Sequence, residues 1–286
     1  GMRGGHMCSG STLANLTAIW AARDSKDVQR VVASQAAHLS IQKAARMLRL
    51  PIEVVPASKQ GQLDTSQLGD VSDACLVLTA GTTATGEIDP LELIGRARWT
   101  HVDAAWGGPL RLSSTHFHKL AGIEGADSVA VSAHKLLMQP KDSALVMFRD
   151  PELANSAISF GGGYLTTPNI GVQGSRGAAA ISLLATLLAL GRAGIAERID
   201  RVMEMANQLA EKLRADENIE LLAMPKTGVT VFRPRNFDTD GIHAKLPSGM
   251  FSTCVIEDER WLRSVAANPL ADIDLIVTTI KEAVRG

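Results

Sequence analysis

The chain has 286 residues, of which 45% are hydrophobic, and its 30 acidic and 29 basic side chains nearly cancel. This length and apolar fraction fit a globular protein with a large core, divided into one large and one smaller domain. The charge indicates neither a nucleic-acid nor a membrane surface, and no apolar run reaches the roughly 18 residues of a membrane helix. Three well-separated cysteines suit neither a metal site nor a disulfide framework, so we expect reduced thiols in a cytoplasmic protein.

Apolar runs and helical patterns alternate along the first part of the chain, as in βαβ units around a mostly parallel sheet. We expect helices over 12–23 and 38–49, and strands over 29–34, 52–55, 76–79, 99–103, 128–131 and 144–148. Another helix should begin at Pro90, and the glycine run 161–163 predicts a loop.

The last part of the chain follows a different pattern. Helices are expected at about 175–192 and 195–215, then strands near 228–233 and 251–256 and a helix near 270–284. This change places a domain boundary near residue 194. We therefore predict an α/β protein with a large domain, 1–194, built on a mostly parallel sheet, and a small α+β domain, 195–286.

The most informative residues are Lys135, which follows a predicted strand, and Asp103, which ends an earlier one. A lysine amine can form a Schiff base with pyridoxal 5'-phosphate (PLP), and a carboxylate can keep the pyridine nitrogen protonated, so that the ring acts as an electron sink. Ligands of open α/β sheets bind beyond the carboxyl ends of the strands, where both residues fall. The alternative, a surface salt bridge, leaves the small residue Ala105 and the glycines after it unexplained.

Three further pieces suit a PLP site, although each has an ordinary structural reading. The small residues Ser9, Gly10 and Ser11 precede a helix, whose free N–H groups could bind a phosphate; a plain helix cap is the commoner use of such residues. His38 opens a helix and could stack on the pyridine ring, or could be a capping or surface histidine. The hydroxyl of Thr82, after a buried strand, could reach the cofactor or simply end the strand.

These pieces lie within six ordered segments: MCSGSTLANLTAIWAARD, AHLSIQKAARML, LTAGTTATGEIDPL, HVDAAWGG, ADSVAVSAHKLLMQPKDSALVMFRD and GSRGAAAISLLATLLALGRAG. Together they resemble the group II PLP-dependent amino-acid decarboxylases, which include the glutamate, aromatic-amino-acid and 2,4-diaminobutyrate decarboxylases. The tail LRSVAANPLADIDLIVTTI is similar to the closing segment of that family. The resemblance implies a PLP-dependent transferase fold of type I and an obligate homodimer with the site at its interface.

The resemblance also implies roles around the cofactor ring. Lys135 would form the Schiff base, and Asp103 would pair with the pyridinium nitrogen. His38 would stack on one face of the ring, Ala105 would lie on the other, and Thr82 would lie near the ring substituents. Of these residues, Lys135, His38 and Asp103 are the expected catalytic set.

Other positions match the family around the phosphate. Gly10 and Ser11 would hold it with help from Ser132, and His134, the neighbour of the Schiff-base lysine, would lie near it. Arg176 matches a family arginine that follows a mobile loop. It is taken as supporting the resemblance.

Two departures from the family pattern bear on activity. Relatives normally carry a long segment before the phosphate motif, which wraps the partner subunit, so we expect either a 5'-truncated gene product or an abbreviated family member. The mobile loop of the family usually presents a tyrosine that protonates the carbanion, but the chain between Tyr164 and Arg176 is short. We therefore expect a packing role for Tyr164, the only tyrosine, and weakened or absent decarboxylation.

The favoured function is decarboxylation of an L-amino acid to its amine. The string HKLLMQPKDSALVMFRD and the scarcity of aromatic residues favour a small polar substrate of the 2,4-diaminobutyrate, aspartate or glutamate class. A carbon–sulfur lyase of the same fold would need a mobile reactive cysteine after the lysine, whereas Cys254 falls in a predicted strand. A catalytically weak or inactive PLP-binding homologue is the third reading. The expected partners are the amino acid and a second copy of the chain, with no metal, nucleic acid or membrane.

Overall fold

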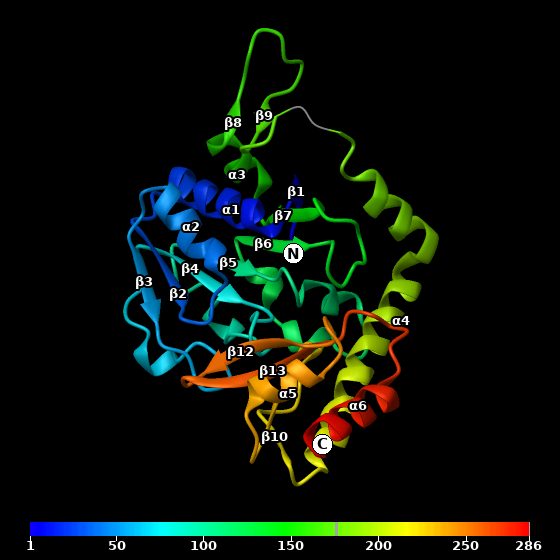
Figure 1. Cartoon of the computed structure of the whole chain (residues 1–286). Coiled ribbons are helices and arrows are strands. Elements are labelled where there is room, and N and C mark those ends of the chain that lie inside the picture. Colours follow the sequence, from blue (N-terminus) through cyan, green and yellow to red (C-terminus); the bar gives the residue numbers. More distant parts are fainter. Residues whose placement is uncertain (175–176, 286) are drawn as a thin grey trace.

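The computed structural model describes residues 1–174 and 177–285, and within them the largest sheet has seven strands, in the order β1-β7-β6-β5-β4-β2-β3 (Figure 1). The strands are β1 (Gly4–Cys8), β2 (Arg30–Ser34), β3 (Ile52–Val55), β4 (Ala74–Thr79), β5 (Trp99–Asp103), β6 (Ser128–Ser132) and β7 (Ala144–Phe148). The pairs from β3 to β6 are parallel, whereas β7 runs antiparallel to both β6 and β1. This mostly parallel sheet confirms the α/β fold of type I.

Both faces of the sheet are covered, which explains why its central strands read as continuous apolar runs. Alternate residues of β4 enter different cores: Cys75 and Val77 pack under α1 (Ser11–Lys26) and α2 (Leu39–Met47). Leu76 and Leu78 join the opposite core, which also contains side chains of the long helix α4 (Ile181–Arg214).

The expected strands of this sheet all form, and their ends agree within two residues. The edge strand β1 was missed because its glycines conceal the alternating pattern. Gly5 sits so close to β7 that an added Cβ would lie 2.1 Å from the carbonyl oxygen of Val146. A short helix, α3 (Pro151–Ala157), was also missed.

The helix expected at Pro90 is wrong. Only a short 3-10 turn forms there, over Leu91–Leu93, with Pro90 as its N-cap. Gly95, at φ 89°, then turns the chain toward β5. A left-handed residue so soon after the start leaves no room for an α-helix.

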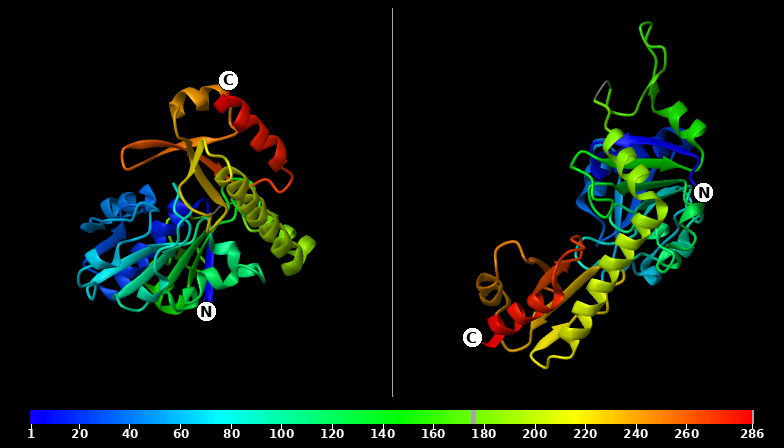
Figure 2. Two further views of the ribbon diagram at one scale, coloured as in Figure 1. Left: turned by 90° about the horizontal axis from the view of Figure 1, so that it is seen from below. Right: turned by 90° about the vertical axis from the view of Figure 1, so that its right-hand side faces the viewer.

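The two helices expected at 175–192 and 195–215 form one long element, α4, which begins only at Ile181. Gly191 interrupts its helical geometry with φ 60° and ψ −178°, conformations that glycine reaches readily. Figure 2 shows α4 passing along the side of the large sheet and ending in the C-terminal part of the chain. The break lies close to residue 194, although the division into two domains there stays a prediction.

The C-terminal part has the expected α+β character. Its four-stranded antiparallel sheet has the order β10-β11-β13-β12. The elements are β10 (Ile219–Leu221), β11 (Val229–Pro234), α5 (Thr239–Lys245), β12 (Ser252–Ile256), β13 (Glu259–Val265) and α6 (Ile273–Arg285). Phe232, Leu262 and Ile280 share its core with the end of α4. A separate ribbon, β8 (Ser159–Phe160) and β9 (Asn169–Ile170), carries the predicted glycine loop, which stands out from the body (Figure 1).

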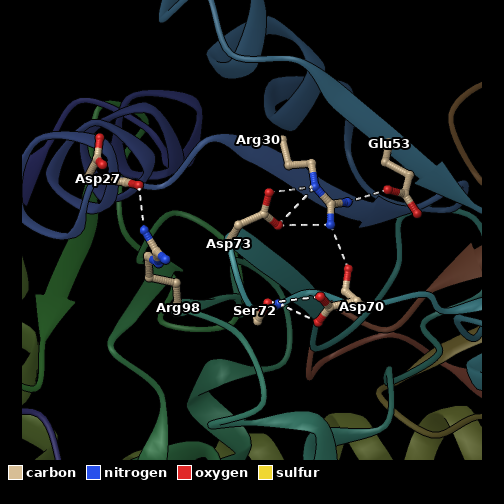
Figure 3. Close-up of polar contacts among 7 residues, drawn as sticks. All are labelled: Asp27, Arg30, Glu53, Asp70, Ser72, Asp73 and Arg98. Atoms are coloured by element: carbon tan, nitrogen blue, oxygen red, sulfur yellow. Dashed lines mark hydrogen bonds and ion pairs between the residues drawn. The ribbon is translucent and has the colours of Figure 1, made fainter.

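The amino ends of three strands are tied together by Arg30 (Figure 3). Its guanidinium, at the start of β2, lies 2.9 Å from a carboxylate oxygen of Asp73, which precedes β4. It also contacts Glu53 on β3 and donates to the carbonyl of Asp70 at 2.6 Å. Because β2, β3 and β4 are parallel, this cluster lies at the amino ends of the strands. A ligand is expected at the opposite side, beyond the carboxyl ends.

Candidate active site

Asp103 and the segment that carries Lys135 leave the sheet at the same edge. Asp103 is the last residue of β5, and Lys135 comes three residues after the end of the neighbouring parallel strand β6. The carboxylate of Asp103 is buried, and each oxygen accepts one hydrogen bond: from the N–H of Ala105 at 3.1 Å and from Nδ2 of Asn15 at 2.8 Å. Both donors are neutral, so the carboxylate is fixed in direction and keeps its charge available to a cationic ligand.

The amine of Lys135 is suited to act as a nucleophile. Burial lowers the pKa of Lys135, the nearby charge of Asp103 opposes that shift, and the cation of Arg263 adds to it. Within residues 1–174 and 177–285, no carboxylate lies within ion-pair distance of its Nζ. A lowered pKa increases the neutral fraction, which is the form that attacks a carbonyl. The surface salt bridge considered as an alternative is therefore not the arrangement found.

The start of α1 and the end of β6 meet at the position expected for a phosphate. The hydroxyl oxygens of Ser11 and Ser132 lie 2.6 Å apart. Gly10 is the N-cap of α1, no side chain caps the helix there, and its first turn has no acidic residue. A Cβ added at Gly10 would meet no atom within 4 Å, so this helix start faces open space. Uncapped N–H groups and a positive helix end fit a phosphate better than they fit a plain cap.

His134 lies beside this cluster but is engaged elsewhere. Its Nδ1 lies 3.2 Å from the carbonyl oxygen of Ser143, just before β7. The backbone N–H of Ser132 donates to the carbonyl of Ala105 at 3.2 Å and so ties the ends of β5 and β6 together.

His38 has the capping role considered for it, and its stacking on the cofactor ring stays a prediction. It is the N-cap of α2, and its Nδ1 accepts from the N–H of Ser40 at 3.2 Å. Its ring also lines a cavity of about 800 Å³, together with Lys59, Cys254 and Arg263. Burial lowers the pKa of His38, the charge of Asp103 raises it, and Lys135 and Lys43 lower it further. The lowered pKa favours the neutral form of the ring.

Three other expectations have different outcomes. The hydroxyl of Thr82 serves its own loop, because it accepts from the N–H of Glu87 at 2.9 Å and lies 2.8 Å from that of Thr85. Its place near the cofactor stays a prediction. Tyr164 does not pack within the chain, since it is 89% exposed in the projecting loop. Arg176 lies outside the described residues.

Comparison with known proteins agrees with this geometry. The family described as "Pyridoxal-dependent decarboxylase conserved domain" matches residues 3–235. The chain belongs to this family. The match confirms the family resemblance and PLP as the cofactor inferred from the sequence.

Relatives within the pyridoxal-dependent decarboxylases include the aspartate 1-decarboxylase of Aliivibrio fischeri, 32% identical over 80% of this chain and 50% of its own length. The L-2,4-diaminobutyrate decarboxylase of Acinetobacter baumannii is 33% identical over 71% of this chain and 45% of that protein. The chain thus spans about half the length of the curated relatives it matches. The crystal structure of mouse CSAD superposes with a TM-score of 0.84 at 25% identity, covering 98% of this chain and 72% of that one.

Several residues of the site were not identified from the amino-acid sequence of this chain. Asn15 and His101 are completely buried next to Asp103, and Ser40 links Asn15 to His38. A polar residue inside the apolar stretch of α1 was the available signal for Asn15. Arg263 gave no such signal, because it reaches the cavity from β13 in the C-terminal sheet.

Proposed function

We propose that the chain binds PLP covalently through Lys135 and removes the α-carboxylate of an L-amino acid as CO2, leaving the amine. One observation carries this proposal: an amine with a lowered pKa and no ion-pair partner among the described residues lies in the field of the buried Asp103 carboxylate. Bound PLP supplies the electron sink for the electron pair that departing CO2 leaves behind.

The residues of the site have separate tasks in this proposal. Asp103 holds a proton at the ring nitrogen, because the two donors that reach its carboxylate from the described residues are neutral and do not compete with a cationic ring nitrogen. His38 would lie on one face of the cofactor ring and Ala105 on the other. His38 would also limit access to the ring from the cavity. The phosphate is held where α1 begins and β6 ends, by Gly10, Ser11 and Ser132, and His134 lies near it.

The cavity supports a small polar substrate. Its lining includes the cation of Arg263, which suits a carboxylate, and the carboxylates of Glu257 and Asp258, which suit an amine. Lys59 pairs with Glu257 at 3.2 Å. No phenylalanine, tyrosine or tryptophan belongs to the lining formed by the described residues. We therefore propose substrates of the aspartate, glutamate or 2,4-diaminobutyrate class.

Borohydride trapping followed by a substrate panel tests the function. Borohydride should fix PLP onto the wild-type chain and onto the control Lys119→Ala, but not onto Lys135→Ala. The wild type should then release CO2 from at least one small polar amino acid. Trapping that persists in Lys135→Ala would refute the site, and a PLP-loaded protein inactive on the whole panel would refute decarboxylation in favour of a non-catalytic homologue.

The carbon–sulfur lyase reading gains no support from the cysteine it requires. Cys254 lies within β12, where a backbone ladder holds it in place. Burial raises the pKa of its thiol, which the nearby cations of Arg263 and Arg260 only partly oppose. A protonated thiol in a strand is a poor mobile nucleophile.

A homodimer is also part of the proposal. Large apolar side chains are exposed from the β8–β9 ribbon to the first half of α4: Phe160, Tyr164, Val172, Ile181, Leu184 and Leu188. Such a surface is unusual on a monomer and suits a second copy of the chain.

None of the described helices is long and apolar enough to cross a membrane. A cytoplasmic location stays a prediction.

A further inference from the structure

Asn15 is completely buried on α1, and its carboxamide contacts three polar side chains, two on β5 and one on α2. Its Nδ2 donates to Oδ2 of Asp103 at 2.8 Å and to Oγ of Ser40 at 2.9 Å. Its Oδ1 lies 3.0 Å from Nε2 of His101. A carboxamide has two N–H donors and one acceptor oxygen, so every hydrogen-bonding group of Asn15 is used inside the site.

The directions of these hydrogen bonds follow from Asp103. An ionised carboxylate only accepts, so the nitrogen of Asn15 must face Asp103 and the oxygen must face His101. His101 therefore donates from Nε2, and its Nδ1 accepts from the hydroxyl of Ser128, 2.9 Å away. That hydroxyl accepts in turn from the indole N–H of Trp99 at 2.8 Å. Burial lowers the pKa of His101 to about 4, against the opposing charge of Asp103, so the ring is neutral.

A second branch leads from Asn15 to the cavity. Because the hydroxyl oxygen of Ser40 accepts from Asn15, its hydrogen is directed to Nδ1 of His38, 2.8 Å away. The backbone N–H of Ser40 donates to the same nitrogen at 3.2 Å. A neutral His38 with two donors on Nδ1 must carry its proton on Nε2.

We propose that Asn15 is a positioning residue whose single carboxamide sets the hydrogen-bonding direction of both Asp103 and His38. Through one branch it holds the Asp103 carboxylate with a neutral donor, without weakening its charge. Through the other it keeps His38 neutral, with an Nε2–H at the cavity that can donate to a carboxylate. The catalytic meaning of this arrangement rests on the proposed function, whereas the hydrogen-bond pattern belongs to the protein alone.

Nuclear magnetic resonance of the histidines in the cofactor-free wild type gives the first test. Nitrogen-15 chemical shifts report which ring nitrogen carries the proton. His101 and His38 should both be Nε2–H tautomers with Nδ1 as acceptor. A dominant Nδ1–H tautomer at either histidine would overturn the proposal before any residue is changed.

The variant Asn15→Asp gives the second test. It has nearly the same shape, but it replaces the N–H donor to Asp103 with a second carboxylate. The added charge should raise the pKa of His101 by about one to three units, because an opposite charge within hydrogen-bonding distance favours the cation. Loss of the bond to Asp103 should weaken PLP binding by about 10- to 100-fold, measured by titrating the cofactor-free protein.

The matched control is Thr17→Val. Thr17 lies two residues further along α1 and is equally buried, and its hydroxyl donates to the carbonyl of Leu13 in the same helix. This variant should leave both histidine pKa values and PLP affinity unchanged. If a folded Asn15→Asp protein behaved like Thr17→Val, the proposal would be wrong.

Ser40→Ala separates the two branches. Removal of the hydroxyl takes one donor from Nδ1 of His38, so the pKa of His38 should rise from its lowered value toward the ordinary one. The charges of Asp103, Lys135 and Lys43 around His38 are unchanged, and His101 should titrate as in the wild type. An unshifted His38 would refute this branch. Since these readouts need no turnover, an inactive wild type with the expected tautomers would refute the proposed function but not this inference.

Discussion

At the scale of single residues, the sequence identifies those whose chemistry and position at a strand end are both informative. Asp103 and Lys135 fulfil both conditions, and the structure brings them to the same edge of the sheet. Asn15 and Arg263 were not predicted, because the role of each depends on contacts with residues far away in the chain. Asn15 contacts a carboxylate 88 positions later, and Arg263 donates to the carbonyl of Thr83 from another sheet.

Asp103→Asn tests the electron-sink role. An amide cannot hold a proton at the pyridine nitrogen by charge, so the variant should keep some PLP binding but lose roughly 100-fold or more in kcat, about 3 kcal/mol of transition-state stabilisation. Asp73→Asn, on the opposite edge of the sheet, is the control and should retain full turnover. Steady-state kinetics of the loaded proteins measure both, and unchanged turnover in Asp103→Asn would remove this carboxylate from the mechanism.

Asp89 should make stability depend on pH. This buried carboxylate accepts from the N–H groups of Leu63 and Thr79, yet burial raises the pKa of Asp89 from 3.8 to about 6. Between these values the folded state binds more protons than the unfolded one. The contribution of Asp89 to the free energy of unfolding therefore falls by about 2 kcal/mol as pH rises from 4 to 7.

Urea unfolding of the wild type and Asp89→Asn at several pH values isolates this contribution. The wild type should lose stability relative to the variant as pH rises. Burial lowers the pKa of His101 to about 4, so its contribution to stability rises with pH, opposite to that of Asp89. This contribution is the same in both proteins and cancels when their free energies of unfolding are subtracted. A difference in stability that stays constant from pH 4 to pH 7 would contradict the assignment.

At the scale of elements, buried parallel strands were the most predictable feature. Apolar runs bounded by turn residues predicted β2 to β7, since these strands are covered on both faces or bounded by clear turns. The short strands β1 and β10 were missed because neither shows a regular alternation. The union of two predicted helices into α4 could not be foreseen, because Gly191 both breaks the helical geometry and lets the chain continue.

Gly191→Ala tests that break. At φ 60° and ψ −178° an alanine is strained, although its Cβ would meet no atom within 4 Å. The variant should therefore lose about 1–3 kcal/mol of stability through the backbone alone. Gly194→Ala, three residues further along the same helix, has no positive φ and should change stability by less. Thermal and urea unfolding measure both, and equal effects of the two substitutions would show that backbone strain is not the cause.

At the scale of the whole molecule, the loop after β4 joins the large sheet to the C-terminal sheet. The hydroxyl of Thr227 donates to the carbonyl of Gly86 at 2.6 Å, and the indole N–H of Trp106 donates to the carbonyl of Thr227 at 2.5 Å. Gly86 has φ 72°, and a Cβ there would lie 2.6 Å from the Thr227 hydroxyl. This close approach explains how Arg263 comes to face a cavity that it shares with His38.

The exposed apolar surface predicts the state of assembly. Leu184 and Leu188 lie one helical turn apart on α4, and their exposed fractions are 53% and 76%. A homodimer that covers them should bury more than about 1,000 Å² in total, the range of specific interfaces.

The double variant Leu184→Glu, Leu188→Glu places charges at this surface and should shift the protein from dimer to monomer in light scattering. Leu270→Glu is the control, because Leu270 is 88% exposed in the segment before α6 and is not one of the six residues of the exposed apolar surface. A wild type that is already a monodisperse monomer, or a Leu270→Glu protein that dissociates as readily as the double variant, would rule out this surface as the dimer interface.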